Sequence, residues 1–228
     1  MKLNTLNRDI INNIINYIIF KPKNKDELQE AVDLWSENID EALNYYGHIS
    51  NWNTSLINDM RGLFEHKEEF NQDISQWNVS NVTDMSDMFS EVFSFNQPLN
   101  SWDVSSVTNM SHMFSGAKSF NQLLNSWNVS NVKSMEDMFR EAPSFNQNIS
   151  QWNVSNVTDM AGMFQGASSF NQDISKWSVS NVTSMRYMFS EASLFNQPLD
   201  SWDVSSVTAM NYMFQKASSF NQDISKWN

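Results

Sequence analysis

The histidines and acidic residues are the side chains of this chain that could do chemistry. His48, His66 and His112 stand in three different sequence contexts, so they form no Ser-His-Asp set and no metal-ligand spacing. The 228 residues include no cysteine, which excludes disulfides, zinc–thiolate sites, iron–sulfur clusters and thiol nucleophiles. The sequence therefore predicts no catalytic residue, no metal and no cofactor, and we expect a protein that is not an enzyme.

Acidic residues outnumber basic ones, with 26 Asp and Glu against 14 Lys and Arg, for a net charge of −12. Phosphate groups need clustered lysine and arginine, so this balance argues against nucleic acid or an anionic membrane as the partner. Asp73, Asp173 and Asp223 occupy equivalent positions, but non-acidic residues interrupt the series. A calcium site along the series would need oxygen ligands at neighbouring positions, so we expect none.

A repeat of 25 residues must position these side chains. Tryptophan recurs at this step from Trp52 to Trp227, and the tripeptide Phe-Asn-Gln recurs from Phe70 to Phe220. Seven complete units occupy residues 52–226, and an eighth begins at Trp227. We expect ladders of equivalent side chains, with the asparagine buried and its amide bonded to its equivalents. The ladder residues are Trp77, Trp102, Trp127, Trp152, Trp177 and Trp202, with Asn96, Asn121, Asn146, Asn171 and Asn196.

Each unit predicts one short helix followed by one short strand. In the second unit the apolar residues Val82, Met85, Met88 and Phe89 have the spacing of one buried helical stripe. The segment that follows, FNQPLNSW, is extended in character. Stacked units can bury a common core, with parallel strands about 4.8 Å apart. We therefore predict a repeat solenoid over residues 52–228, with parallel β-strands on one face and short helical turns opposite.

Two series of variable positions supply the candidate binding residues, because packing does not fix their identity. The residue after Phe-Asn-Gln runs Asp73, Pro98, Leu123, Asn148, Asp173, Pro198 and Asp223. The pair between the two methionines also varies, and it contributes His112, Arg186, Tyr187 and Tyr212. We expect a protein partner to read one of these stripes, although drift at exposed positions is an equally simple explanation.

The pattern V-T-x-M-x-x-M-F-x-x-A-x-x-F-N-Q-x-I-S-x-W-x-V-S-N, which holds through residues 52–228, resembles BspA-type leucine-rich-repeat surface proteins. In particular it is similar to the 25-residue repeat family of mycoplasma lipoproteins, which also occurs in protists and giant viruses. The resemblance implies a right-handed solenoid with parallel β-structure on one face. It also implies an adhesion or protein-binding role.

Residues 1–51 precede the repeats and are predicted to form a helical N-terminal cap. Apolar spacing predicts one amphipathic helix over 3–19 and a second over 26–45, stopped by Gly47. Solenoids need such caps on their terminal units. A second hypothesis is that LNRDIINNIINYI resembles the opening of an F-box. The protein would then be a ubiquitin-ligase substrate adaptor that docks on the ligase through residues 3–20 and binds substrate with its repeats.

The N-terminal sequence and the last repeat give predictions about the cellular compartment and about the C-terminal end of the array. Asn, Arg and Asp interrupt the apolar residues near the N-terminus, and no lipidation cysteine is present, so we expect a cytoplasmic protein rather than surface display. No apolar run approaches about 18 residues, so no membrane insertion is expected.

After the seventh unit no altered repeat follows, which predicts an uncapped coil with Val204, Val207, Met210, Met213 and Phe214 edge-on. Either the chain is a fragment of a longer array, or this coil docks on another copy. If the chain is complete, we expect an end-to-end homodimer through this coil.

Overall fold

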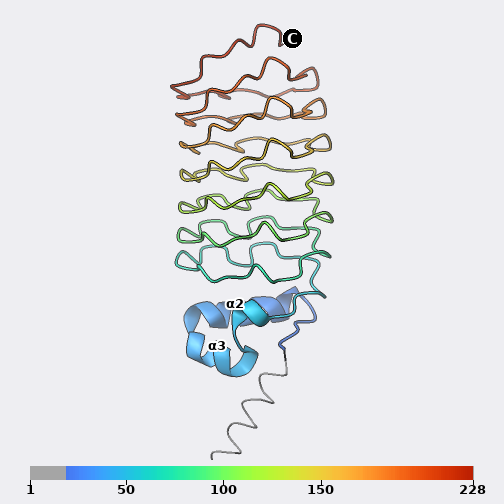
Figure 1. Ribbon diagram of the computed structural model, residues 1–228, viewed down its shortest axis with the longest axis vertical. Helices are drawn as coiled ribbons and strands as arrows, with labels where there is room; N and C mark the ends of the chain where they lie inside the picture. Colours follow the sequence, from blue (N-terminus) through green and yellow to red (C-terminus); the bar gives the residue numbers. More distant parts are fainter. Residues whose placement is uncertain (1–18, 228) are drawn as a thin grey trace, which may run out of the picture.

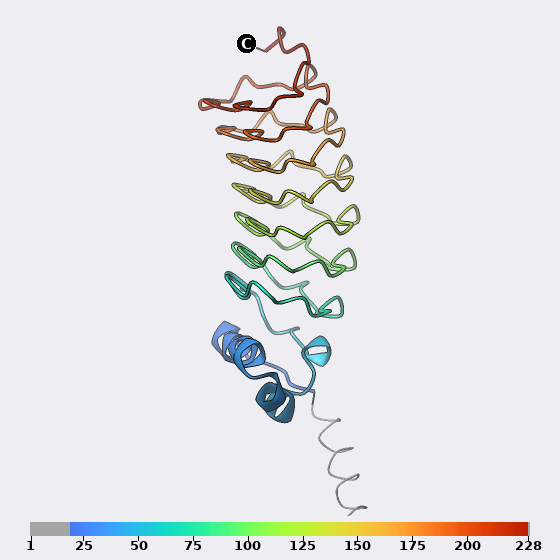
Figure 2. The same ribbon diagram turned by 90° about the vertical axis from the view of Figure 1, so that its left-hand side faces the viewer.

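The computed structural model describes residues 19–227, so the predicted helix over 3–19 and the F-box-like segment at 3–20 lie almost entirely outside the described residues. The described chain begins with two packed helices and continues as a column of stacked coils that runs to the opposite end (Figure 1). A view turned by 90° shows the same column, with the helices lying across its first coil (Figure 2). Each coil comprises one repeat of the sequence: coil one is 52–76, and coils two to seven begin at residues 77, 102, 127, 152, 177 and 202.

Helix α2 spans Lys25–Glu37 and helix α3 spans Ile39–Tyr46, so the single helix predicted over 26–45 is in fact two. Asn38 separates them: its backbone N–H donates to the Leu34 carbonyl at the end of α2, while its side chain accepts from the Glu41 N–H at the start of α3. A short polar side chain is favoured at such a start because it satisfies an orphan N–H. Gly47, with φ of 68°, ends α3, and the short 3-10 helix η1 covers Ile49–Asn51.

The predicted leucine-rich-repeat solenoid, with parallel strands on one face and helical turns opposite, is wrong. Within residues 19–227 no helix lies in the coils, and strand pairing is reduced to isolated parallel bridges, one residue per coil, from Asp59↔Asp84 to Ser184↔Ala209. The coils consist of turns and extended connections. The bridges lie where the helix was predicted, and the segment predicted as a strand has no strand pairing.

Backbone conformation explains why the predicted helix does not form. In coil two, Asp87 and Glu91 have φ of 59° and 57°, in the left-handed region. A left-handed residue in every four interrupts the right-handed helix. The N–H of Met88 bonds three residues back to Met85, while that of Phe89 bonds forward to the Met113 carbonyl of the next coil. The chain therefore alternates between local turns and bonds to its neighbour.

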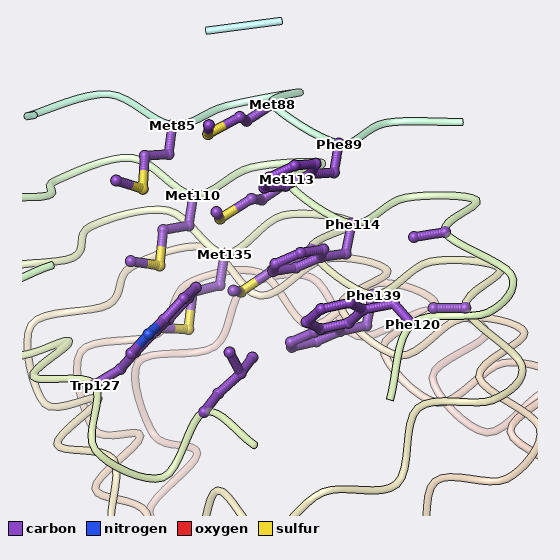
Figure 3. Close-up of a cluster of buried hydrophobic side chains, with 14 of the residues drawn as sticks. Met85, Met88, Phe89, Met110, Met113, Phe114, Phe120, Trp127, Met135 and Phe139 are labelled. Carbon is purple, nitrogen blue, oxygen red and sulfur yellow. The ribbon is translucent and has the colours of Figure 1, made fainter. Parts of the chain in front are cut away.

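The core consists of ladders of equivalent side chains along the column. Figure 3 shows part of them, with Met85, Met110 and Met135 in one ladder and Phe89, Phe114 and Phe139 in another. The rings of Phe64, Phe89 and Phe114 follow one another at 5.4 and 5.5 Å between centroids, nearly parallel. Trp127 is 3 % exposed and stacks on Trp152 at 6.3 Å. From Trp77 onward each indole N–H donates to the carbonyl of the residue 28 positions earlier; that of Trp127 donates to the Leu99 carbonyl at 2.9 Å. Among the described residues no buried side-chain nitrogen or oxygen lacks a hydrogen-bond partner.

The asparagines of Phe-Asn-Gln form a ladder of a different kind from the one predicted. They are half-buried in the interior coils, and the bond between them runs from backbone to side chain, not from amide to amide. The Oδ1 of Asn146 accepts the backbone N–H of Asn171 at 3.0 Å and the Nε2 of Gln172 at 2.9 Å. The Nδ2 of Asn146 has no hydrogen-bond partner within residues 19–227. The side chain therefore acts as an acceptor between coils.

This geometry predicts that acceptor capacity, not the amide, determines stability at position 146. Asn146→Ala should lower the free energy of unfolding by about 1–3 kcal/mol, because it leaves the Asn171 N–H without its partner. Asn146→Asp keeps an acceptor oxygen and should cost less than about 1 kcal/mol at neutral pH. Denaturant unfolding measures both, with Lys133→Ala, a change at an exposed residue of the same coil, as the control. Equal losses for the Ala and Asp variants would contradict the acceptor role.

Candidate functional site

The stripe after Phe-Asn-Gln is exposed along the whole column. All of its predicted members lie at the surface: Asp73, Pro98, Leu123, Asn148, Asp173, Pro198 and Asp223. The carboxylates of this stripe, however, form hydrogen bonds within their own turns. Asp73 and Asp173 each accept the backbone N–H of the serine two residues on at 2.9 Å, and these serine hydrogen bonds lower the pKa of both carboxyl groups. The polar members of the stripe thus stabilise their own turns.

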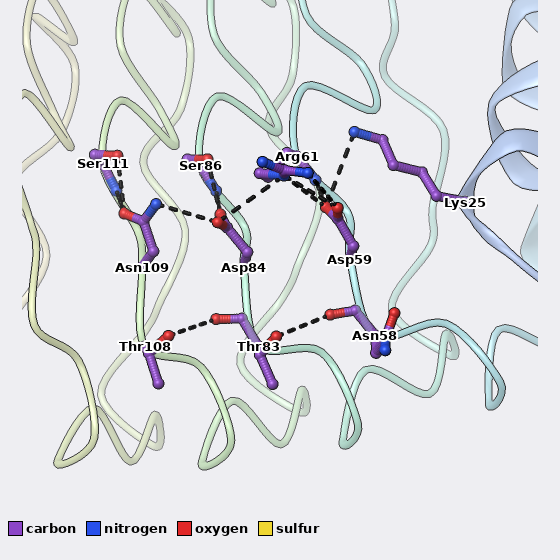
Figure 4. A network of polar contacts seen from close by, with 10 residues as sticks. All are labelled: Lys25, Asn58, Asp59, Arg61, Thr83, Asp84, Ser86, Thr108, Asn109 and Ser111. Atoms are coloured by element: carbon purple, nitrogen blue, oxygen red, sulfur yellow. Dashed lines mark hydrogen bonds and ion pairs between the residues drawn. The ribbon is translucent and has the colours of Figure 1, made fainter.

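A second surface, which we call the ladder face, is formed by residues 59–66 of coil one and their equivalents in the other coils. Its backbone joins neighbouring coils through bonds such as Met60 N–H to the Asp84 carbonyl at 3.0 Å. Side chains join the coils as well (Figure 4). Arg61 donates to Asp59 at 2.8 Å and lies 4.0 Å from Asp84, while Thr83 Oγ1 donates to the Asn58 carbonyl at 3.2 Å. This face carries the second stripe of candidate residues.

Left-handed backbone positions hold His112, Tyr187 and Tyr212, three of the four candidate residues of the ladder face. Two positions in every coil have positive φ, and sequence reasoning did not identify them. The available signal was glycine, which takes this conformation without strain and recurs at both positions. The first position holds Gly62, Asp87, His112, Asp137, Gly162, Tyr187 and Tyr212, and the second holds His66, Glu91, Gly116, Glu141, Gly166, Glu191 and Lys216.

Asp137 is the centre of a charged cluster on this face. Its side chain is only 15 % exposed, and its Oδ2 lies 3.5 Å from Arg140 and 3.6 Å from the Nδ1 of His112 in the preceding coil. The carboxylate covers Gly162 of the next coil so closely that a methyl group there would lie 1.8 Å from Oδ1. Burial raises the pKa of Asp137, and it raises that of the adjacent Glu136 as well.

An aromatic and basic cluster lies further along the ladder face. Tyr187 and Tyr212 of consecutive coils stack with their ring centroids 5.0 Å apart, and Tyr212 is 56 % exposed. Arg186 is exposed beside them, and the Lys216 amine is 2.6 Å from Glu191. The structure therefore brings together Tyr187 and Tyr212, two of the predicted binding residues. His112 belongs instead to the Asp137 cluster.

Metal binding and membrane insertion find no support in the part of the chain that the structure describes. Between residues 19 and 227 no group of three or more histidine, aspartate or glutamate side chains is arranged to hold a metal ion. No helix in the same range is long and apolar enough to cross a membrane.

Comparison with known proteins places the chain in a family. The family model described as Mycoplasma protein of unknown function, DUF285, matches residues 33–152 and 138–228. Together these matches run from within α2 through all the coils. No curated protein and no solved structure matches the chain.

The burial of Asp137 predicts a pH dependence of stability with a definite sign. Because the pKa is raised in the folded state, the protonated carboxyl is favoured by folding, and that contribution is lost as pH rises through the folded pKa. The free energy of unfolding of the native chain, compared with that of Asp137→Asn, should therefore decrease as the pH rises from about 3 to about 6. Urea unfolding across that range measures the difference.

Asp173→Asn provides the matched control with the opposite sign. The pKa of Asp173 is lowered by its bonds to Ser175, so its contribution is present above the unfolded pKa and lost as pH falls. Relative to this variant, the native chain should gain stability over the same rise in pH. Slopes of the same sign at both positions would contradict the burial of Asp137.

Proposed function

The chain belongs to the family described as Mycoplasma protein of unknown function, DUF285, and for it we propose a non-enzymatic protein-binding scaffold of the adhesion type. The adhesion role is suggested by the resemblance of the repeat to BspA-type surface proteins. We propose that the ladder face recognises the partner and that the rest of each coil is structural.

One observation carries this proposal: the outward positions of the ladder face differ from coil to coil, although its backbone repeats. The first left-handed position alone holds glycine, aspartate, histidine or tyrosine. In coils two to six the core positions, by contrast, keep phenylalanine, methionine and tryptophan, and these side chains are buried. A regular backbone that presents a different side chain in each coil is suited to binding an extended protein surface specifically.

The cluster of Arg186, Tyr187 and Tyr212 is the part of this face that we assign to the partner contact. Tyrosine and arginine dominate the binding energy of protein interfaces, because they bury large areas and still form hydrogen bonds. Arg186 has no ion pair within the described residues, unlike Arg61 and Arg140. We propose that its guanidinium pairs with a carboxylate of the partner while the tyrosine pair packs against an apolar side chain.

Site-specific photo-crosslinking in a native lysate tests the proposal. A photoreactive phenylalanine in place of Tyr187 should give a discrete adduct with a partner protein. The same group at Asp173, on the stripe after Phe-Asn-Gln, should not. The adduct should be lost when Arg186→Glu is added, because the charge of the proposed contact is reversed. Thermal unfolding of the Arg186→Glu chain should be nearly unchanged, since surface substitutions usually shift stability by about 0.5 kcal/mol or less.

Two outcomes would contradict this assignment. If the adduct forms from Asp173 and not from Tyr187, the partner reads the other stripe. If the adduct from Tyr187 persists with Arg186→Glu, the contact does not depend on the cluster.

A further inference from the structure

The Phe-Asn-Gln segment of coil one lacks the neighbour that the same segment has in every later coil. In coils two to seven the backbone N–H of this asparagine donates to the Oδ1 of its equivalent in the preceding coil, as Asn96 does to Asn71 at 2.9 Å. Two residues earlier, the N–H of Ser94 donates to the Glu68 carbonyl, also at 2.9 Å. Coil one directly follows α2, α3 and η1, so the described chain offers it no preceding coil.

Backbone donors of coil one are consequently left without acceptors at this edge. Within residues 19–227 no group accepts from the N–H of Glu69 or Asn71, the equivalents of the two bonded residues just described. In the same range the side-chain amide of Gln72 makes no hydrogen bond, whereas the equivalent Gln97 donates to the Oδ1 of Asn71 at 3.0 Å. An extended edge of coil one therefore presents a row of hydrogen-bond donors.

A groove lies along this edge, between coil one and the junction of helices α2 and α3. Its volume is about 650 Å³, within the range of ligand-binding pockets, about 300–1,000 Å³. The apolar part of its lining is formed by Trp35, Ile39 and Phe70, and Ile39 is 44 % exposed. Phe70 stacks on Phe95 at 6.0 Å, but the equivalent rings of coils two to six have such a neighbour on both sides. The groove thus borders a ring of the ladder that is stacked on one side alone.

The rim of the groove is acidic. Glu37, Glu68 and Glu69 line it, and all three are exposed. No ion pair within the described range involves any of them. The lysine that lines the groove, Lys67, is already paired with Asp33 at 2.7 Å. The field at the groove therefore favours a ligand that carries a cation beside its apolar anchor.

We propose that this groove binds an extended peptide segment of a partner protein, which adds to coil one as a preceding coil would. The segment carries an aromatic residue followed by asparagine. The aromatic ring stacks on Phe70, and the asparagine Oδ1 accepts from the Asn71 N–H and the Gln72 amide. Main-chain hydrogen bonds to an exposed edge provide affinity in this mode of recognition, and side-chain pockets provide specificity.

A lysine two residues before the aromatic residue completes the proposed segment. Its carbonyl accepts from the Glu69 N–H, and its side chain lies over Glu68. Residues at this position do contact their equivalents, because the amine of Lys118 lies 3.4 Å from the ring centre of Phe93 in the preceding coil. The repeats of a second copy cannot supply the segment, since their aromatic residues at this position are buried in coils two to six.

This groove is a second site, separate from the ladder-face cluster of the proposed function. It shares no residue with Arg186, Tyr187 and Tyr212. The two assignments can therefore fail or succeed independently.

Binding of a synthetic peptide to the full chain tests the site. The peptide AKSFNQL, copied from residues 117–123, has the required residues in the required order. Calorimetric titration should show saturable binding to one site, with a dissociation constant below about 1 mM. The same peptide with alanine in place of phenylalanine should show no binding in that range, because it lacks the apolar anchor.

A charge swap tests the contact between the peptide lysine and the rim. Glu68→Lys should weaken binding of AKSFNQL at least about tenfold at low ionic strength, because like charges then face each other. A peptide with glutamate in place of its lysine should bind this variant at least about tenfold more tightly than it binds the native chain. The control is Glu30→Lys, which makes the same change in net charge at an exposed residue of α2 outside the groove, and it should leave both affinities nearly unchanged.

Amide hydrogen exchange tests the register of the bound peptide. The amides of Glu69 and Asn71 should exchange more slowly in the presence of saturating peptide, because they acquire acceptors. The amides of Ser94 and Asn96 already donate to coil one and should not change.

Three results would overturn the proposal. One is the absence of saturable binding of AKSFNQL up to about 1 mM. Another is equal affinity of the native and Glu68→Lys chains for that peptide. The third is binding that leaves exchange at Glu69 and Asn71 unchanged, which would place the peptide elsewhere on the chain.

Discussion

The ladder of backbone hydrogen bonds between coils is the interaction on which this structure depends. An isolated coil has about 25 residues, no helix and no strand, so it cannot bury a core by itself. Stacking satisfies its alternate N–H groups with carbonyls of the next coil, as between Phe114 and Met138 at 2.9 Å. Buried backbone groups need such partners. The 25-residue step is conserved along the chain because an insertion would break this register.

Side-chain ladders fill the space that the backbone ladder encloses. The indole of Trp152 donates to the carbonyl of Leu124, and the Oδ1 of Asn121 accepts from Asn146, so the polar atoms at the edge of the core are bonded between coils. The fixed residues of the repeat are thereby committed to structure. Variation is left for outward positions, and on the ladder face these include left-handed residues such as Asp137 and Tyr187. This division of roles is why we assign recognition to that face.

The buried ladders could be predicted from the sequence, because equivalent residues of a regular stack must lie on one another. Trp127 and Phe89 are buried as that reasoning requires. The local backbone could not be predicted in the same way. The spacing of Val82, Met85 and Met88 fits a helical stripe, and it fits a succession of turns equally well. What decides between them is bonding to a coil 25 residues away, which has no local signal.

Only part of the candidate site could be predicted, because contacts with neighbouring coils decide how its residues are placed. The variable pairs between the methionines identified Tyr187 and Tyr212, which the structure stacks together. Asp137 was missed, because its burial depends on His112 in one neighbouring coil and on Gly162 in the other. The repeated glycines at left-handed positions were the one indication in the sequence. The break between α2 and α3 was missed because Asn38 lies within a continuous amphipathic pattern.

Residue-resolved hydrogen exchange is the measurement that tests the ladder of bonds between coils most directly. In coil four the amides of Met135, Asp137, Phe139 and Glu141 all donate to coil five, and they should exchange slowly as a group. Their equivalents in coil seven, beginning with Met210, should exchange rapidly in the monomer although their sequence is nearly the same. Equal protection in coils four and seven would contradict the account, because it would show that bonds within each coil, and not bonds between coils, hold these amides.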